Sequence, residues 1–224
     1  DWGGPGAVLN IGMNDERCSH LSKNIGKKAA SELYFRFIQA YSVNVARLDP
    51  DVFDHITDAN GSSVSAALAA YKEEMDDSFP QSIEHQLSEV LRSMARAWQG
   101  TSARLLREAK GAPADAGLGL VIQKMAFGVG DGESGSGVLQ LVNSETGKQQ
   151  ITGRYLRQSQ GRESLTEKQG SLYLTSDSRG PSLETEEPAL FNTLIKNAKL
   201  MRRKLREEMQ IEFTIENGKL HILD

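Results

Sequence analysis

A glycine-rich stretch between two apolar runs places the strongest constraint on the fold of this chain. Residues 118–147 read LGLVIQKMAFGVGDGESGSGVLQLVNSETG. The apolar runs over 118–127 and 138–142 predict two strands, because short apolar runs bounded by turn residues are typical of strands. The glycines between them predict a flexible loop. Strand, loop and strand together predict a hairpin at the centre of the fold.

The loop composition also has chemical implications. Glycine has no Cβ, so its backbone N–H groups can approach an anion closely, and a loop of this kind between strands can cover a polyphosphate. The same composition is equally typical of an exposed hairpin tip that binds nothing. The residues alone leave both interpretations open.

Composition sets wider bounds on the protein. With 224 residues, 38% of them apolar and 25% charged, the chain is long enough for one large or two small domains with a substantial core. A net charge of -4 gives no reason to expect nucleic acid as a partner. No apolar run approaches the roughly 20 residues that span a bilayer, so no membrane is expected. A single cysteine, Cys18, excludes an internal disulfide and indicates a reducing, cytoplasmic location. The opening DWGGPG, without methionine, suggests a truncated or processed chain.

Helical and strand periodicities divide the rest of the chain. Apolar residues at helical spacing predict helices over 27–48, 62–75, 82–99, 102–109 and 188–208. Alternation predicts a strand over 149–156, a short strand over 171–175, and a hairpin over 211–223 around the turn pair Asn217 and Gly218. The basic residues near the end of the last helix are more typical of a solvated face than of an anion site.

Several of these segments resemble the nucleotide-binding domain of pyruvate, phosphate dikinase and phosphoenolpyruvate synthase. That domain carries VQ-x-MVFG, then GETSGTGV and a TG turn. The matching residues here are Gln123, Met125, Phe127, Gly128, Ser134, Gly135, Gly137, Val138, Thr146 and Gly147. The similarity continues in VLNIGMND (8–15), RFIQAY (36–41), FPQ (79–81) and EFTIENGKL (212–220), and so covers nearly the whole chain.

The resemblance implies an α+β, ATP-grasp-like fold: a small, mainly antiparallel sheet with packed helices and a helical subdomain. Residues 1–26 would form a glycine-rich entry segment whose N-terminal part is missing. Residues 27–113 would form the helical subdomain, and residues 114–224 the sheet subdomain.

The resemblance also implies a site for ATP. Adenine would meet the backbone near 123–125, and the phosphates would lie under the central loop and against the entry glycines. The implied contacts are Gln123, Lys124, Met125, Gly132, Glu133, Ser134, Gly135, Gly3, Gly4 and Gly6. A frayed terminus is the other interpretation of the three entry glycines. The family's phosphate-neutralising lysine and arginine precede this segment and have no counterpart in the chain.

The terminal hairpin would supply the Mg²⁺ ligands, since hard cations take oxygen ligands. Glu212 matches the family's glutamate, and Asp224 stands where a glutamine is usual, while Gln210 replaces an aspartate. A two-residue turn pairs Glu216 with Lys219 and sends Glu212 and Asp224 to opposite faces. A three-residue loop would place those two carboxylates together at the expense of the apolar match, so the metal site and the apolar pattern favour different registers.

Other positions depart from the family pattern. Val142 and Asn143 replace an Arg-Asp pair, Arg162 replaces a glutamate, and no histidine lies in the setting of the family's phosphocarrier histidine. The phosphohistidine and pyruvate-binding domains would lie on other sequence, so a complete dikinase cycle is not expected on this chain alone. The resemblance implies an ATP-Mg-binding domain that delivers a phosphoryl group to a histidine on another domain. The alternative is a degenerate, non-catalytic domain with a regulatory or interaction role.

Overall fold

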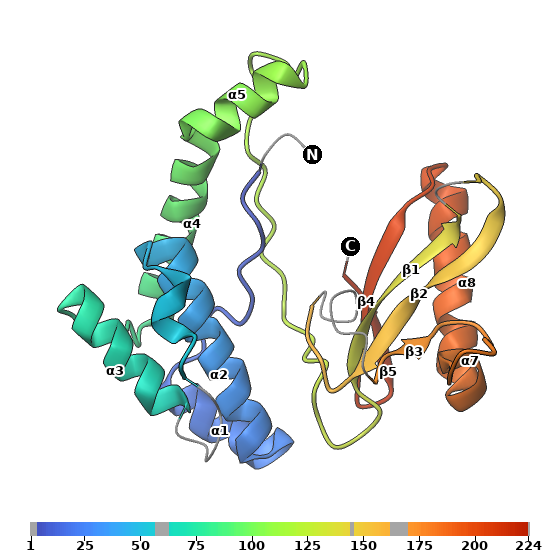
Figure 1. Ribbon diagram of the computed structural model, residues 1–224, viewed down its shortest axis with the longest axis horizontal. Coiled ribbons are helices and arrows are strands. Elements are labelled where there is room, and N and C mark those ends of the chain that lie inside the picture. Colours follow the sequence, from blue (N-terminus) through green and yellow to red (C-terminus); the bar gives the residue numbers. More distant parts are fainter. Residues whose placement is uncertain (1–3, 57–62, 144–145, 162–169, 224) are drawn as a thin grey trace. The chain divides into compact units, whose positions relative to one another are not determined.

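The chain folds into two compact units. The computed structural model describes residues 4–56, 63–143, 146–161 and 170–223. The units are Asp1–Met125 and Ala126–Asp224 (Figure 1). Helices make up the first, and the second is a sheet with a long helix, so the expected α+β class is confirmed and the architecture is ATP-grasp-like. The finer division at residues 26 and 113 stays a prediction.

The first unit is a set of helices around an aromatic core. Phe37 and Tyr41 on one helix pack against Tyr71 and Phe79 with ring centroids 5.2 to 6.4 Å apart. The expected helix over 27–48 changes to a π-helix after Tyr41. The elements are α1 (Asp15–Ile25), α2 (Lys27–Tyr41), the π-helix η1 (Ser42–Ala46), the 3₁₀ helix η2 (Pro50–Phe53), α3 (Ser63–Met75), α4 (Ile83–Gln99) and α5 (Thr101–Ala109).

A polar network ties the start of the first unit to the turn before α4. The side chain of Gln86 is fully buried, accepts from Gly12 N at 2.9 Å and donates to Met13 O and Pro80 O. Gln81 Oε1 accepts from Asp15 N at 2.9 Å, which supports the first turn of α1. Hydrogen bonds therefore join two segments that are distant in sequence, VLNIGMND (8–15) and FPQ (79–81).

The second unit is a five-stranded antiparallel sheet in the order β3-β2-β1-β4-β5. Its strands are β1 (Gly135–Val142), β2 (Gln149–Arg157), β3 (Leu172–Tyr173), β4 (Gln210–Glu216) and β5 (Lys219–Ile222), and its helices are α7 (Leu183–Glu186) and α8 (Pro188–Leu205). Figure 1 shows α8 lying along the sheet. Leu194, Ile195 and Ala198 of α8 pack on Leu139, Ile211 and Phe213 of the sheet. The strands expected over 149–156 and 171–175 and the terminal hairpin are confirmed.

The strand expected over residues 118–127 is not formed. These residues are irregular, and the side chains of Val121 and Ile122 are 86% and 66% exposed. β1 pairs with β2 on one side and with β4 on the other, so both of its edges are already used. An apolar alternation needs a partner strand to become a strand, and the expected hairpin with residues 138–142 was therefore wrong.

No described helix is both long enough and apolar enough to cross a membrane.

Candidate functional site

The glycine-rich loop is docked on the turn between β4 and β5. Asn217 and Gly218 have φ angles of 50° and 75°, the left-handed pair that a two-residue hairpin turn requires. Asn217 N donates to Ser134 Oγ at 2.9 Å, and Gly218 N donates to Glu133 O at 2.8 Å. In return, Gly132 N donates to Asn217 Oδ1 at 3.2 Å. Three hydrogen bonds thus hold the loop and the turn together.

A second side chain closes the loop from the end of β2. Gln158 Oε1 accepts from Gly130 N at 3.2 Å, and Gln158 Nε2 donates to Gly130 O at 2.9 Å. The amides of Gly130 and Gly132 therefore both point at side-chain carbonyl oxygens. The loop offers N–H donors to oxygen acceptors, which is the chemistry that a phosphate group needs.

Glu133 lies in an internal network beside this loop. Tyr155 OH donates to Glu133 Oε1 at 2.9 Å, and Arg157 Nε lies 3.0 Å from both carboxylate oxygens. Arg157 also pairs with Glu186 at 2.6 Å. Burial, reinforced by the hydrogen bond to Glu133, raises the pKa of the Tyr155 hydroxyl well above its usual range. Glu133 therefore anchors the loop to β2 and α7.

Packing accounts for the glycines at the start of β1. A Cβ on Gly135 would lie 2.3 Å from Leu156 O, and one on Gly137 would lie 2.5 Å from the Phe213 ring. At Gly128 the Cβ would meet Ser159 O at 1.8 Å. These three glycines are required by close contacts within the unit, whatever the loop binds. The sequence left anion binding and an unliganded hairpin tip both open as reasons for the glycines, and neither interpretation included these contacts.

The expected adenine contacts Gln123, Lys124 and Met125 lie in the irregular segment before the sheet. Gln123 and Lys124 are exposed and Met125 is partly buried. They belong to the unit Asp1–Met125, whereas Gly132, Glu133, Ser134 and Gly135 belong to Ala126–Asp224. The structure brings together the loop residues of the second unit, and the role of the 123–125 segment stays a prediction.

The expected metal ligand Glu212 lies on β4, on the face of the sheet away from α8. Its neighbours Ile211 and Phe213 point into the core with α8, and its partner on β1 is Val138. The hairpin has the register with the two-residue turn: Glu216 pairs with Lys219, and Leu223 N donates to Glu212 O at 2.9 Å. The apolar pattern favoured this register. The shared metal site required the other register, with a three-residue loop. Asp224 lies outside the described residues.

Metal-ligating side chains do not gather in threes within the described part of the chain. Glu212 is the described carboxylate at the expected metal position. Mg²⁺ usually takes only one or two protein carboxylates and completes its octahedron with phosphate oxygens and water. The residues present therefore suit Mg²⁺ only if a phosphate ligand arrives with it.

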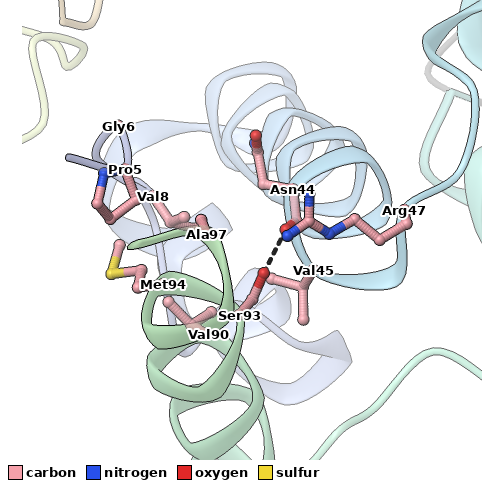
Figure 2. A pocket seen from close by; sticks show the side chains of 10 residues that line it. All are labelled: Pro5, Gly6, Val8, Asn44, Val45, Arg47, Val90, Ser93, Met94 and Ala97. Carbon is pink, nitrogen blue, oxygen red and sulfur yellow. Dashed lines mark hydrogen bonds between the residues drawn. The ribbon is translucent and has the colours of Figure 1, made fainter. Parts of the chain in front are cut away.

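The entry glycines lie at the start of the first unit. Gly3 is outside the described residues, and Gly4 and Gly6 are exposed, with open space around each. Gly6 lines a cavity of about 130 Å³ together with Arg47, which follows η1 (Figure 2). Sequence reasoning did not single out Arg47, and no motif marks it.

Sequence comparison with known proteins assigns the chain to a family. No family model matches the chain. Over 243 residues the chain is 30% identical to pyruvate, phosphate dikinase of Rhizobium meliloti (strain 1021). The match covers 96% of this chain and 27% of that protein. The chain is a partial, divergent domain of the pyruvate, phosphate dikinase family. The dikinase of Clostridium symbiosum is 30% identical over 235 residues, and the chloroplastic dikinase of Flaveria trinervia is 27% identical over 233.

The match to the dikinase family covers nearly all of this chain but little of each relative. The chain spans about a quarter of the length of the dikinases it matches, 27% and 26% for the two bacterial proteins. The relationship shows a domain of the dikinase family, and the rest of each dikinase lies outside the matched region.

Proposed function

We propose that this domain binds ATP with Mg²⁺ and, as part of a dikinase-like phosphotransferase, delivers a phosphoryl group of ATP to a histidine on another domain. The observation that carries the proposal is the glycine-rich loop, whose Gly130 and Gly132 amides are directed at oxygen acceptors. The dikinase relationship over 96% of the chain supports it. The acceptor histidine and the pyruvate-binding part would lie on other sequence.

In this proposal the chain's own residues act by position and charge. The loop amides would take phosphate oxygens, and Glu212, with Asp224, would hold Mg²⁺ against them. Gln123, Lys124 and Met125 would meet the adenine, and the entry glycines Gly3, Gly4 and Gly6 would approach the phosphates. Phosphoryl transfer depends on such positioning and charge neutralisation, so no covalent role for this domain is needed.

Calorimetric titration of the chain with ATP, with and without Mg²⁺, tests the proposal. We expect Glu212→Gln to weaken binding of Mg-ATP by about tenfold, equivalent to about 1.4 kcal/mol, because a metal ligand is lost. Binding of metal-free ATP should change little. Glu207→Gln, which removes an exposed carboxylate outside the sheet, is the matched control. Equal effects of the two variants would contradict the metal role of Glu212.

A second candidate function follows from the same region. Asn217 and Gln158 already fill the acceptor positions of the loop amides, and the hairpin has the register with the two-residue turn, not the one that the shared metal site required. These contacts favour a degenerate dikinase domain that keeps the scaffold and serves as a regulatory or interaction module. The absence of any heat with Mg-ATP from a folded sample would support this second function against the first.

A further inference from the structure

A cavity in the first unit combines an apolar floor with a single cation. It has a volume of about 130 Å³ and lies where the segment at Gly6 meets η1 and α4. Val45 and Val90 form part of the floor and are 7% and 1% exposed, so this surface is fixed by the core beneath it. Met94 also contributes to the apolar lining.

Arg47 brings a positive charge to this cavity. Figure 2 shows its guanidinium directed from the end of η1 toward the other labelled side chains. No acidic side chain is among the cavity's lining residues, and no described carboxylate forms an ion pair with Arg47. By contrast, Arg92 on α4 is paired with Glu89. The guanidinium thus retains its donors for a ligand.

The backbone around Arg47 is specialised. The chain leaves α2 through a π-helix, and Arg47 has φ 67° and ψ 29°, a left-handed conformation that costs a non-glycine residue about 1 kcal/mol or more. Ser93 Oγ donates to Asn44 O at 2.6 Å, which ties this turn to α4. The Ser93 hydroxyl hydrogen is used there, and Asn44 Nδ2 donates to Ala40 O at 2.9 Å, so Arg47 supplies the charged donors at the cavity.

We propose that this cavity binds a short-chain carboxylate. A guanidinium matches the two oxygens of a carboxylate with parallel hydrogen bonds. An apolar cavity of about 150 Å³ can hold benzene, so a volume of about 130 Å³ accommodates a ligand of roughly six heavy atoms. Val45, Val90 and Met94 would cover the alkyl part of such a ligand, a contact that inorganic phosphate cannot make. Of the residues proposed for the ATP site, Gly6 also lines this cavity, and the central loop residues do not.

Propionate is the probe for this site. In ¹H–¹⁵N NMR titrations of the chain at constant pH and ionic strength, propionate should shift the amides of Gly6, Val45 and Val90. Arg47→Gln should raise the Kd at least tenfold, since a charge-assisted pair is lost. Arg47→Lys, which keeps the charge without the planar fork, should give an intermediate Kd. Arg104→Gln on α5 is the control and should leave the Kd unchanged.

Two further arms separate the ligand classes and guard against misfolding. Ala97→Trp, which brings a large side chain into the cavity, should abolish the shifts while Arg47 is intact, so the test does not depend on the Arg47 variants alone. Propionamide, which is neutral, and inorganic phosphate, which has no apolar part, should bind at least tenfold more weakly. Equal binding of either compound, or unchanged propionate binding in Arg47→Gln or in a folded Ala97→Trp variant, would overturn the proposal.

Discussion

Replacing Asn217 tests whether the contact between the loop and the turn is an energetic link. Asn217→Gly keeps a residue that accepts φ 50° and removes the acceptor of the Gly132 amide. The loss of one hydrogen bond predicts a local destabilisation of about 1 kcal/mol. Asn217→Ala loses the same bond and also places a Cβ-bearing residue in left-handed backbone, which adds about 1 kcal/mol. Asn217→Asp keeps an acceptor oxygen and should change stability least.

Amide hydrogen exchange at Gly132 is the assay for this prediction. A local cost of about 1 kcal/mol corresponds to roughly fivefold faster exchange in Asn217→Gly. Tryptophan fluorescence does not serve here, because Trp2 and Trp98 both belong to the unit Asp1–Met125. The amide of Tyr34 in that unit is the internal reference and should not change. If Gly132 exchanges at the same rate in Asn217→Gly and in the parent chain, the docking contact contributes nothing and the reasoning is refuted.

Three further predictions concern the packing and the titration of the two units. Gly137→Ala should destabilise the sheet by about 1–3 kcal/mol, because its Cβ would lie 2.5 Å from the Phe213 ring, whereas Gly119→Ala meets nothing within 4 Å; amide exchange of β1 measures the difference. Gln86→Leu should lower the free energy of unfolding by about 3 kcal/mol, because Gly12 N and two carbonyls lose their hydrogen-bond partner. Urea unfolding followed by tryptophan fluorescence measures this loss, and Gln99→Leu at an exposed position is the control that should show none. Burial raises the pKa of the Cys18 thiol above its ordinary 9.0. The contribution of the protonated thiol to the free energy of unfolding is therefore present below pH 9.0 and is lost as the pH rises through the higher pKa of the folded state. A pH profile of iodoacetamide alkylation with a midpoint at or below 9.0 would contradict this.

Local signals predicted much of the fold correctly. Pro188 at the first turn and the apolar spacing after it predicted the helix that forms as α8 (Pro188–Leu205). Asn217 and Gly218 with their flanking apolar residues predicted both the terminal hairpin and its register. In each case the information lies within one segment, where turn chemistry and periodicity act directly.

Features that depend on distant segments could not be predicted in this way. Residues 118–127 alternate like a strand, but β1 is already paired on both sides, and only the sheet order reveals this. Gly135 and Gly137 lie in the stretch expected under the phosphates, but a Cβ on Gly135 would meet β2, and one on Gly137 would meet both β2 and β4. A glycine has the same signature in a sequence whether a ligand or another strand approaches it.

The contacts of the candidate site also depend on distant segments, and they provide an experiment that distinguishes the two proposed functions. The sequence identified the loop and Glu212 but could not reveal that Asn217 and Gln158 accept from the loop amides. If those amides bind phosphate, Asn217 competes with ATP, and Asn217→Gly should bind ATP more tightly even though it destabilises the loop. If the domain is a degenerate scaffold, the same substitution lowers protection at Gly132, and neither the parent chain nor the variant binds ATP. Stability and affinity moving in opposite directions would therefore indicate nucleotide binding, because loss of a purely structural contact has no reason to improve it.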